Sequence, residues 1–410
     1  MWPSLWCASS YPVEILNSHL ESRHSLNTGF RIHLNSARTL KSKLKLGAYV
    51  LGLRLFRSLG HPKLGPINVT VSVTNKCNSR CRTCFIWQNQ GSSNNKELTT
   101  DEFARLFESL GRSPYWFTIS GGEPFLRSDL PEICEAAVKY CQPSIINIPS
   151  NGFLPIVIED SVKKIVEMLE SVGETTLIVN LSLDDLGSKH DEIRGIQGNF
   201  DALIDTYKRL EKIRSIHSCL RLGIHSVVSR FNVDSLPQLY EYVKTLRPDS
   251  YITEIAEERS ELFNTGKAIE PTAEDYRKYI KELSRKVRDD FGQSGYLSKI
   301  TQSYRTVYYQ IVSKWMQERR QIIPCYAVYA SCQITSTGDV WPCCVLGYKK
   351  PLGNLRETDY DFKSIWQSER ADEARNLLKR EGCSCPLANA HYTSMLCNVP
   401  IMLRVMKSLM

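Results

Sequence analysis

The sequence has little that would anchor it in a membrane or direct it out of the cell. In the N-terminal part, the apolar run Leu46–Leu53 is far shorter than the ~20 residues that a membrane-spanning helix needs. The first residues lack the basic stretch, apolar core and small-residue cleavage site of a signal peptide. No internal repeat or long disordered tract is evident in the 410 residues, of which 42% are hydrophobic and 23% charged. We therefore expect a globular, enzyme-sized cytoplasmic protein with reduced thiols.

Positive charge is concentrated near the N-terminus. The formal net charge is +8, and residues 1–65 carry nine Lys or Arg against Glu14 and Glu21, which leaves +7 in that segment. Leucines at three-to-four spacing predict an amphipathic helix over residues 36–60. They are Leu40, Leu44, Leu51, Leu55 and Leu59. This helix either makes peripheral contact with a membrane surface or docks on the enzyme body through its leucine face and leaves its lysines in solvent.

From residue 66 onward, strand-like and helix-like segments alternate. The strand candidates are rich in Val, Ile and Thr: Ile67–Thr74, Trp116–Ser120, Ile145–Pro149, Thr176–Leu183, Leu220–Ser229 and Tyr251–Ile255. The helix candidates between them are Thr99–Leu110, Leu130–Tyr140, Asp160–Leu169, Phe200–Ile213 and Ser235–Leu246. This alternation predicts an α/β fold with a parallel sheet, either open and doubly wound or closed into a partial barrel.

Polar and special-geometry residues follow every predicted strand. They are Asn75–Cys84, Gly121–Pro124, Ser150–Gly152, Asp184–Asp185, Arg230–Asp234 and Ala256–Glu258. Because the carboxyl ends of parallel strands meet at one edge, these residues are expected to converge there.

The remainder of the chain differs in composition. The pattern of residues 272–322 predicts helix with many charged side chains. From Pro324 onward the composition shifts to cysteine, glycine and proline. We predict four parts: a basic extension (1–65), a core barrel (66–270), a helical connector (271–323) and a small, irregular, Cys-rich C-terminal domain (324–410).

Three of the 14 cysteines lie directly after the first predicted strand, in Cys77-Asn-Ser-Arg-Cys81-Arg-Thr-Cys84. Such a loop can wrap three thiolates around one face of a [4Fe–4S] cluster, which leaves the fourth iron open for a ligand. Zinc is the alternative metal, but closed zinc sites use four ligands, and no further Cys or His follows within forty residues.

The CxxxCxxC spacing resembles the signature of the radical SAM superfamily. Three further segments share the likeness: Gly121-Gly122-Glu123-Pro124 resembles its GGEP motif, Ser182-Leu183-Asp184 its fourth-strand motif, and His190–Gly195 its HDxxRG segment. Two positions depart from the family pattern: Thr83 stands where an aromatic residue is frequent, and Asp185 where glycine is common.

The resemblance implies a partial (β/α)6 radical SAM barrel that cleaves S-adenosylmethionine (SAM) at the cluster to a 5′-deoxyadenosyl radical. Cys77, Cys81 and Cys84 would then be the catalytic cluster ligands. The SAM-binding residues implied by the likeness are Gly121, Gly122, Glu123, Pro124, Ser150, Asn151, Ser182, Asp184 and Arg194. Among them, Glu123 and the glycine backbone would hold the methionine ammonium, Ser182 the ribose or carboxylate, and Arg194 the carboxylate. The paired acids Asp184-Asp185 and Glu257-Glu258 are either proton-transfer groups or, more simply, solvated acids.

The cysteines beyond Pro324 resemble the opening of a SPASM or twitch auxiliary-cluster domain. Four residues separate Gly338 from Cys343 there, and Gly353-Asn354-Leu355 with Trp366 continues the likeness. The resemblance implies one auxiliary [4Fe–4S] cluster, with ligands chosen from Cys325, Cys343, Cys383, Cys385 and, as a replacement for one of them, Cys397. A structural zinc ion is the alternative to this cluster. Cys332 and Cys344 are expected to be buried as small hydrophobic residues that ligate no metal.

The substrate is the least defined feature. The basic N-terminal segment and the apolar end Val399–Met406 favour a lipid-linked or small-molecule substrate, whereas relatives with auxiliary clusters often modify peptides. An external one-electron donor of the flavodoxin or ferredoxin type is implied. The alternative of another class is a non-catalytic zinc-binding interaction protein. No helix interleaves aromatic and basic residues for contact with bases, so no nucleic-acid partner is expected.

Overall fold

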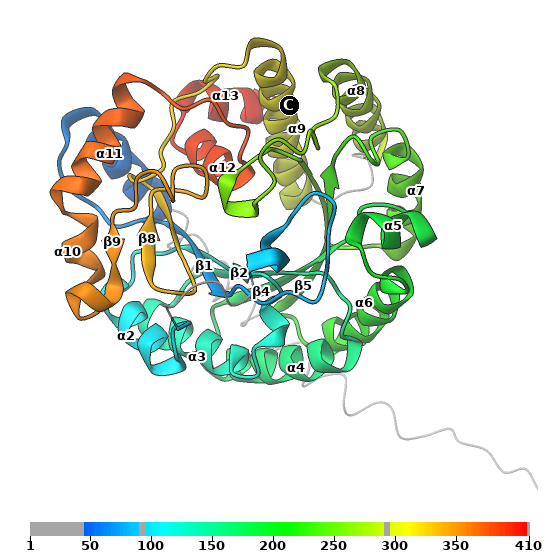
Figure 1. The fold of residues 1–410 in the computed structure, drawn as a ribbon, viewed down its shortest axis with the longest axis horizontal. Helices are drawn as coiled ribbons and strands as arrows, with labels where there is room; N and C mark the ends of the chain where they lie inside the picture. The colour runs from blue at the N-terminus through cyan, green and yellow to red at the C-terminus, as the bar shows by residue number, and fades with distance from the viewer. Residues whose placement is uncertain (1–44, 90–95, 291–295, 408–410) are drawn as a thin grey trace, which may run out of the picture. The chain divides into compact units, whose positions relative to one another are not determined.

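The computed structural model describes residues 45–89, 96–290 and 296–407 (Figure 1). The chain divides into two compact units, Met1–Leu51 and Gly52–Met410, and the sheet and both cysteine clusters belong to the second. No helix in the described part of the chain is long and apolar enough to cross a membrane.

Six parallel strands form the core of the second unit. Their spatial order follows the chain order, as expected when each strand is followed by a helix that returns to the next position. The strands are β1 (Asn68–Thr74), β2 (Trp116–Gly121), β3 (Ile145–Ser150), β4 (Thr176–Ser182), β5 (Leu220–Val228) and β6 (Ser250–Ile255). This is the partial barrel that the alternating pattern predicts, with strand bounds within one residue of the predicted ones.

The connecting helices lie along the outer side of these strands (Figure 1). They are α2 (Thr100–Leu110), α3 (Leu130–Cys141), α4 (Pro155–Val172), α5 (Gly187–Arg194), α6 (Asn199–Ile216) and α7 (Leu236–Leu246). Helix α2 begins at a capping box, because the Thr99 hydroxyl accepts from the Glu102 amide and the Glu102 carboxylate accepts from the Thr99 amide. Helix α4 begins five residues before its predicted start, with Pro155 in its first turn. Helix α5 is short and polar, and the apolar periodicity of the sequence does not predict it.

The cysteine-rich segment contains more regular structure than the sequence indicates. Strand β7 (Ser331–Ile334) pairs in parallel with β1, and β8 (Asp339–Trp341) and β9 (Gly353–Asn354) continue the same sheet. In the described residues these strands make one nine-stranded sheet. The remaining helices are α8 (Ala273–Asp290), α9 (Tyr296–Glu318), α10 (Phe362–Trp366), α11 (Glu369–Arg380), α12 (Ala388–Leu396) and α13 (Val399–Lys407). Short 3₁₀ turns cover Ile86–Asn89, Pro124–Leu126, Ser260–Leu262 and Leu355–Thr358.

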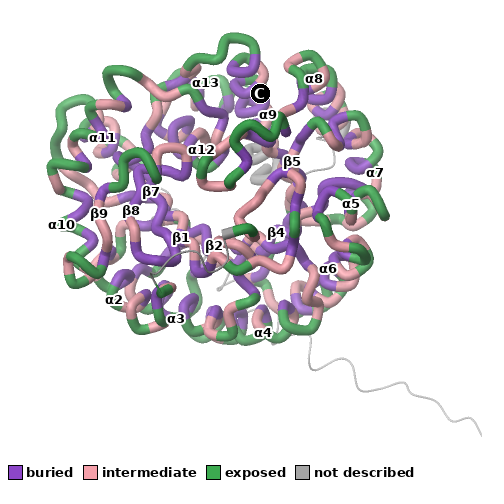
Figure 2. Tube along the Cα trace, viewed as in Figure 1, coloured by how far each residue is buried: buried purple, intermediate pink, exposed green. Residues whose placement is uncertain are grey.

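The two faces of the strands differ in chemistry. In β1, Val69, Val71 and Val73 are fully buried against the helices, whereas Asn68, Thr70 and Ser72 face an internal cavity. The same alternation continues in β2 and β3, since successive side chains of a strand point to opposite faces. Buried residues therefore follow the strands and the inner faces of the surrounding helices (Figure 2).

The basic helix is present over residues 45–59, and Leu40 and Leu44 lie outside the described residues. The prediction that this helix docks on the enzyme body through its leucine face is wrong. Leu53 and Phe56 are 0% and 1% exposed and form the docking face, with Phe56 in edge-to-face contact with Tyr329. Leu55 and Leu59 are 45% and 72% exposed.

Candidate active site

The loop with Cys77, Cys81 and Cys84 joins the end of β1 to a short 3₁₀ turn. The three thiols lie close enough for the charge of one to act on another: burial is the main cause that raises the pKa of Cys84 to about 12, and the neighbouring Cys81 raises it further. Burial likewise raises the pKa of Cys77 to about 11. A desolvated thiolate is costly, so this loop favours thiolates only where a cation, such as the iron of a cluster, neutralises them.

The glycines after β2 fix the start of this loop. The Gly122 amide donates to the Thr74 carbonyl and the Glu123 amide to the Lys76 carbonyl, both at 2.8 Å. A Cβ at Gly121 would lie 2.2 Å from the Thr74 oxygen, and one at Gly122 would lie 2.1 Å from the Lys76 oxygen. Only glycine allows the two backbones to approach this closely.

Glu123 is 1% exposed and joins the ends of two strands. Its carboxylate accepts from the Phe125 amide at 3.2 Å, the Ser150 hydroxyl at 3.0 Å and the Asn151 amide at 2.7 Å. The carboxylate is therefore engaged in holding β2 to β3, while its contact with a methionine ammonium stays a prediction. Pro124 begins the 3₁₀ turn that follows.

Asn151 continues this contact to the cysteine loop. Its side-chain amide donates to Asn78 at 2.7 Å and to the Ser79 hydroxyl at 3.0 Å. The predicted residues Ser150 and Asn151 are thus within one hydrogen-bonded set with Glu123 and the loop between Cys77 and Cys81.

Helix α5 fixes the other half of the loop. The Arg80 amide donates to the Arg194 carbonyl at 3.0 Å, and the Arg82 amide donates to the Ile193 carbonyl at 2.9 Å. Gly195 ends the helix with φ of 68°, directly beside the Arg80 carbonyl. The HDxxRG segment therefore positions the cysteine loop as well as supplying the side chain of Arg194.

Arg194 and Asp184 form a buried ion pair of 3.0 Å. The second oxygen of Asp184 accepts from the Val227 amide at 2.8 Å, so this carboxylate also ties β4 to β5. Arg194 lines a cavity of about 150 Å³ together with Cys81 and Cys84. Its Nε is buried and has no hydrogen-bond partner among the described residues. Ser182 ends β4 opposite His225 of β5.

Asp184 and Asp185 are 1% and 4% exposed, so the interpretation of this pair as solvated acids is wrong. Asp185 accepts from the Leu186 amide and the Ser235 hydroxyl and pairs with Lys189. In the other predicted pair, burial raises the pKa of Glu257 to about 7.

His190 is a functional residue to which sequence reasoning gave no role. Its Nδ1 accepts from the Asp184 amide at 3.1 Å, and its Nε2 lies 3.1 Å from the Asn199 amide oxygen. Burial is the main cause that lowers the pKa of His190 to about 4, so the ring is neutral near pH 7. This neutral ring holds the backbone beside the Asp184–Arg194 pair.

Four of the five predicted auxiliary ligands lie together. Burial mainly raises the pKa of Cys343 to about 12, and the charges of Cys325 and Cys383 raise it further. Cys383 shares a hydrogen bond with Cys385, whose pKa is also raised by Cys325. Cys397 instead lies within the electrostatic reach of Arg54, Tyr304 and Tyr326.

No three His, Cys, Asp or Glu side chains in the described ranges are gathered as ligands of a single metal ion. A [4Fe–4S] cluster places each thiolate on a different iron, so its ligands stand further apart than those of one zinc ion.

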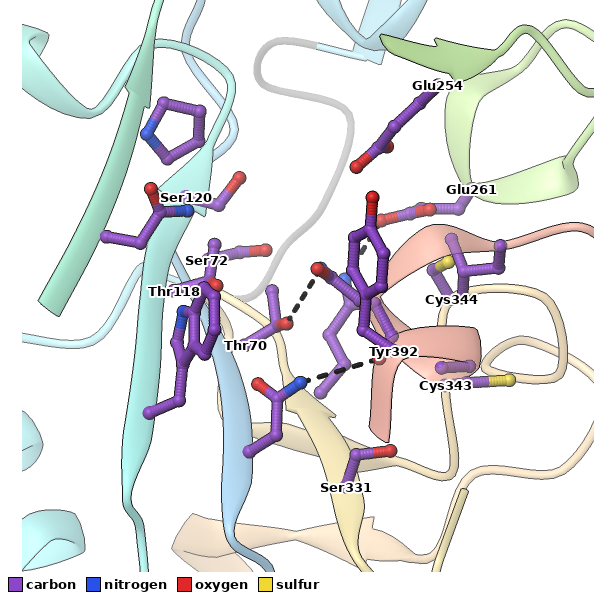
Figure 3. Close-up of a pocket in the computed structure, with 18 of the residues that line it drawn as sticks. Thr70, Ser72, Thr118, Ser120, Glu254, Glu261, Ser331, Cys343, Cys344 and Tyr392 are labelled. Atoms are coloured by element: carbon purple, nitrogen blue, oxygen red, sulfur yellow. Dashed lines mark hydrogen bonds between the residues drawn. The ribbon is translucent and has the colours of Figure 1, made fainter. Parts of the chain in front are cut away.

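A cavity of about 490 Å³ reaches Cys343 of the C-terminal cysteine group. It is lined by residues of the strands on one side and of α9, α12 and the segment around Cys343 and Cys344 on the other (Figure 3). It shares Glu254, Arg259 and Leu262 with the smaller cavity beside Cys81 and Arg194. The two spaces are therefore adjacent.

Cys344 is not the buried apolar spectator that the sequence suggests. It lines the larger cavity, and Arg259 donates a hydrogen bond to its sulfur at 2.8 Å. Cys332, the second expected spectator, lines the same cavity and is 4% exposed.

Two family models match the chain: that of the radical SAM superfamily over residues 71–243 and that of the SPASM iron–sulfur cluster-binding domain over residues 325–386. This chain is a radical SAM protein with a C-terminal SPASM domain. The SPASM match includes Cys325, Cys343, Cys383 and Cys385 and ends before Cys397.

Curated relatives resemble part of this chain. Fe-coproporphyrin III synthase of Methanosarcina barkeri is 29% identical over 43% of this chain and 40% of its own length. GTP 3′,8-cyclase of Helicobacter pylori (strain HPAG1) is 32% identical over 44% of this chain and 52% of its own length. The chain thus spans about half the length of these relatives, or less.

Solved structures share the fold over most of this chain. SuiB of Streptococcus suis bound to S-adenosylmethionine has a TM-score of 0.57 at 16% identity and covers 88% of this chain and 79% of its own. The same protein bound to the precursor peptide SuiA has a TM-score of 0.54 at 17% identity, over 94% of this chain and 79% of its own.

A radical SAM domain followed by a SPASM domain implies a [4Fe–4S] cluster with SAM and an auxiliary iron–sulfur cluster. The residues present fit these groups. Three converging thiols follow β1, and the unpartnered Nε of Arg194 lies in the cavity beside them, where it can donate to a carboxylate. The SPASM match favours iron over the zinc alternative for the C-terminal cysteines.

Proposed function

We propose that this protein reductively cleaves SAM at the cluster of Cys77, Cys81 and Cys84 and abstracts hydrogen from a substrate bound in the 490 Å³ cavity. The observation that carries the proposal is the position of this cavity. It adjoins the smaller space beside Cys81 and Arg194 and reaches Cys343 of the SPASM domain at its other side. A substrate held there would lie between the two cluster sites.

The bound cluster and SAM supply the one-electron chemistry that generates the 5′-deoxyadenosyl radical. The chain's own residues orient and enclose the reactants. The contacts from Gly122, Asn151 and Arg194 fix the cysteine loop at three separate points. The Arg194 side chain, held by Asp184, would orient the SAM carboxylate, while α9 and α12 cover the strands and exclude water.

The substrate is proposed to be a small or lipid-linked molecule. The exposed Leu55 and Leu59 support peripheral contact with a membrane around residues 36–60, of which 45–60 are described. Peptide modification is the second candidate, favoured by the SPASM domain and by the likeness to SuiB, whose solved structure includes a precursor peptide. An external one-electron donor of the flavodoxin or ferredoxin type would complete either reaction.

The test is formation of 5′-deoxyadenosine by anaerobically reconstituted protein given SAM and dithionite. We expect product formation that falls at least a hundredfold in Cys81→Ala. The matched control is Cys134→Ala, a buried cysteine on α3 outside both clusters, which should retain activity. Product that survives Cys81→Ala, or zinc in place of iron in the purified protein, would contradict the proposal.

A further inference from the structure

The 490 Å³ cavity combines a mostly apolar lining with a row of polar side chains along its strands. Small-molecule cavities are ordinarily apolar with a few placed polar groups. Here the lumen faces of β1 to β4 contribute a continuous set of neutral hydroxyl and amide side chains: Asn68, Thr70, Ser72, Thr118, Ser120, Asn147 and Asn180. Figure 3 shows the hydroxyl residues of β1 and β2 opposite Tyr392 of α12.

Several of these groups have no partner within the described protein. The Asn180 side chain is 6% exposed, and its Oδ1 is buried without a hydrogen bond. Asn68 Oδ1 and the Tyr392 hydroxyl are also buried without a hydrogen bond among the described residues. Ser72 and Ser120 are half-buried, and their hydroxyls make no hydrogen bond to another described residue. Buried polar groups are normally paired, so the three buried atoms point to a ligand that supplies donors and acceptors together, and the two free hydroxyls can bond the same ligand.

Charged side chains also line the cavity. They are Arg259, Arg305, Glu254 and Glu261, whose formal charges balance. Arg259 lies 3.7 Å from Glu261, and Glu254 lies 3.7 Å from His225. Arg305 donates to the Tyr251 carbonyl at 2.8 Å. Arg259 Nε, Glu261 Oε2 and His225 Nε2 are buried without a hydrogen bond among the described residues, so these polar groups are also open to a ligand.

Apolar surface accompanies these hydroxyls. The rings of Trp116, Tyr304 and Tyr392 line the cavity, and the Tyr304 and Tyr392 rings stack with centroids 5.8 Å apart. A cavity that offers hydroxyls together with aromatic faces suits a ring that has hydroxyl edges and C–H faces. An acyl chain would bury the free hydroxyls and amides unpaired, at a cost for each group.

We propose that this cavity binds a polyhydroxylated ring, of the sugar or cyclitol class, as the group that loses hydrogen. The inference rests on the proposed function and names its substrate class. The hydroxyls of the ring would bond Ser72, Ser120 and Asn180, and its C–H bonds would face the space beside Cys81 and Arg194.

The test is equilibrium dialysis of the reconstituted full chain with SAM against ¹⁴C-labelled myo-inositol, D-glucose and N-acetyl-D-glucosamine. We expect at least one of them to bind, with affinity at least fivefold lower in the Ser72→Ala/Ser120→Ala double variant. Because those two hydroxyls have no protein partner, their loss should leave the fold intact. The control is Ser58→Ala/Ser171→Ala, which removes two exposed serines and should bind as the parent does.

Binding of none of the three polyols overturns the inference, as does binding unchanged in the double variant. Binding of a serine-containing pentapeptide without binding of a polyol also overturns it and favours peptide modification. SAM cleavage without added polyol, measured on the same preparation, reports the proposed function separately. Intact cleavage with absent polyol binding would reject the substrate class alone.

Discussion

Gly195 lies directly against the backbone of Arg80, so that a Cβ at position 195 would stand 2.2 Å from the Arg80 carbonyl oxygen. The contact joins the end of α5 to the middle of the cysteine loop, between Cys77 and Cys81. Side chains cannot be accommodated at that distance, because the obstacle is backbone and cannot rotate away. The geometry of the cluster loop thus depends on a glycine more than a hundred residues away in sequence.

Gly195→Ala is expected to lower the iron content of the reconstituted protein by at least half, because the cysteine loop must shift to admit the methyl group. The measurement is iron per chain with the absorbance of the cluster near 400 nm. Gly198→Ala is the matched control. Gly198 also has positive φ, 77°, but nothing lies within 4 Å of its added Cβ. The control should lose about 1 kcal/mol of stability and keep its iron. Equal iron loss in both variants would contradict the role of the Arg80 contact.

The sequence is sufficient to predict the parallel core, because Val, Ile and Thr alternate with helical patterns from β1 to β6. It does not predict α5, since the helix is short and its burial depends on His190 and Ile193 rather than on an apolar stripe. Nor does it reveal that β7 joins β1, because that pairing links residues more than 260 positions apart. Contacts of this range leave no local pattern.

The cysteine triad and Arg194 could be found from motifs, but the cavity could not. A signal for it was present: in β1 to β3, polar residues alternate with buried apolar ones in strands whose outer face is covered by helices. Parallel strands buried on both faces are normally apolar throughout, so Thr70, Ser72 and Thr118 indicated a polar interior. The role of Glu123 could not be inferred, since its three hydrogen bonds arise from residues that only folding brings together.

Asp184→Asn should destabilise the protein strongly. Arg194 would lose the charge of its partner in a buried setting, and breaking such a pair costs about 3–5 kcal/mol. The measurement is the free energy of unfolding of the metal-free chain in urea. Asp359→Asn is the matched control, because Asp359 pairs with Arg105 at the surface and is 88% exposed. Its loss should cost less than 1 kcal/mol. Similar losses in the two variants would show that the buried pair does not stabilise this fold.

His190 should make stability depend on pH. Its pKa is about 4 in the folded chain, mainly because of burial, against 6.5 for an ordinary histidine. Between these values the unfolded chain binds a proton that the folded chain does not, so the free energy of unfolding falls as pH falls from 6.5 to 4. His190→Asn retains an acceptor near the Asp184 amide but does not titrate. The difference in the free energy of unfolding between the parent and His190→Asn should be constant above pH 7. Below pH 6.5 the parent should lose stability relative to the variant. His61→Asn, at an exposed position, is the matched control.

The auxiliary cluster provides a test that separates two cysteines of one domain. Cys383 lies beside Cys385 and within the electrostatic reach of Cys325 and Cys343, whereas Cys397 lies beside Arg54 and Tyr326. Two [4Fe–4S] clusters give about eight iron atoms per chain. Cys383→Ser should lower this to about four, because a thiolate ligand is lost, while Cys397→Ser should leave it near eight. Iron and acid-labile sulfide should fall together in the first variant. A fall of the same size in Cys397→Ser would place that cysteine among the ligands. A parent value near twelve iron atoms per chain would mean that the SPASM domain holds two clusters. The group of four cysteines alone could not bind both.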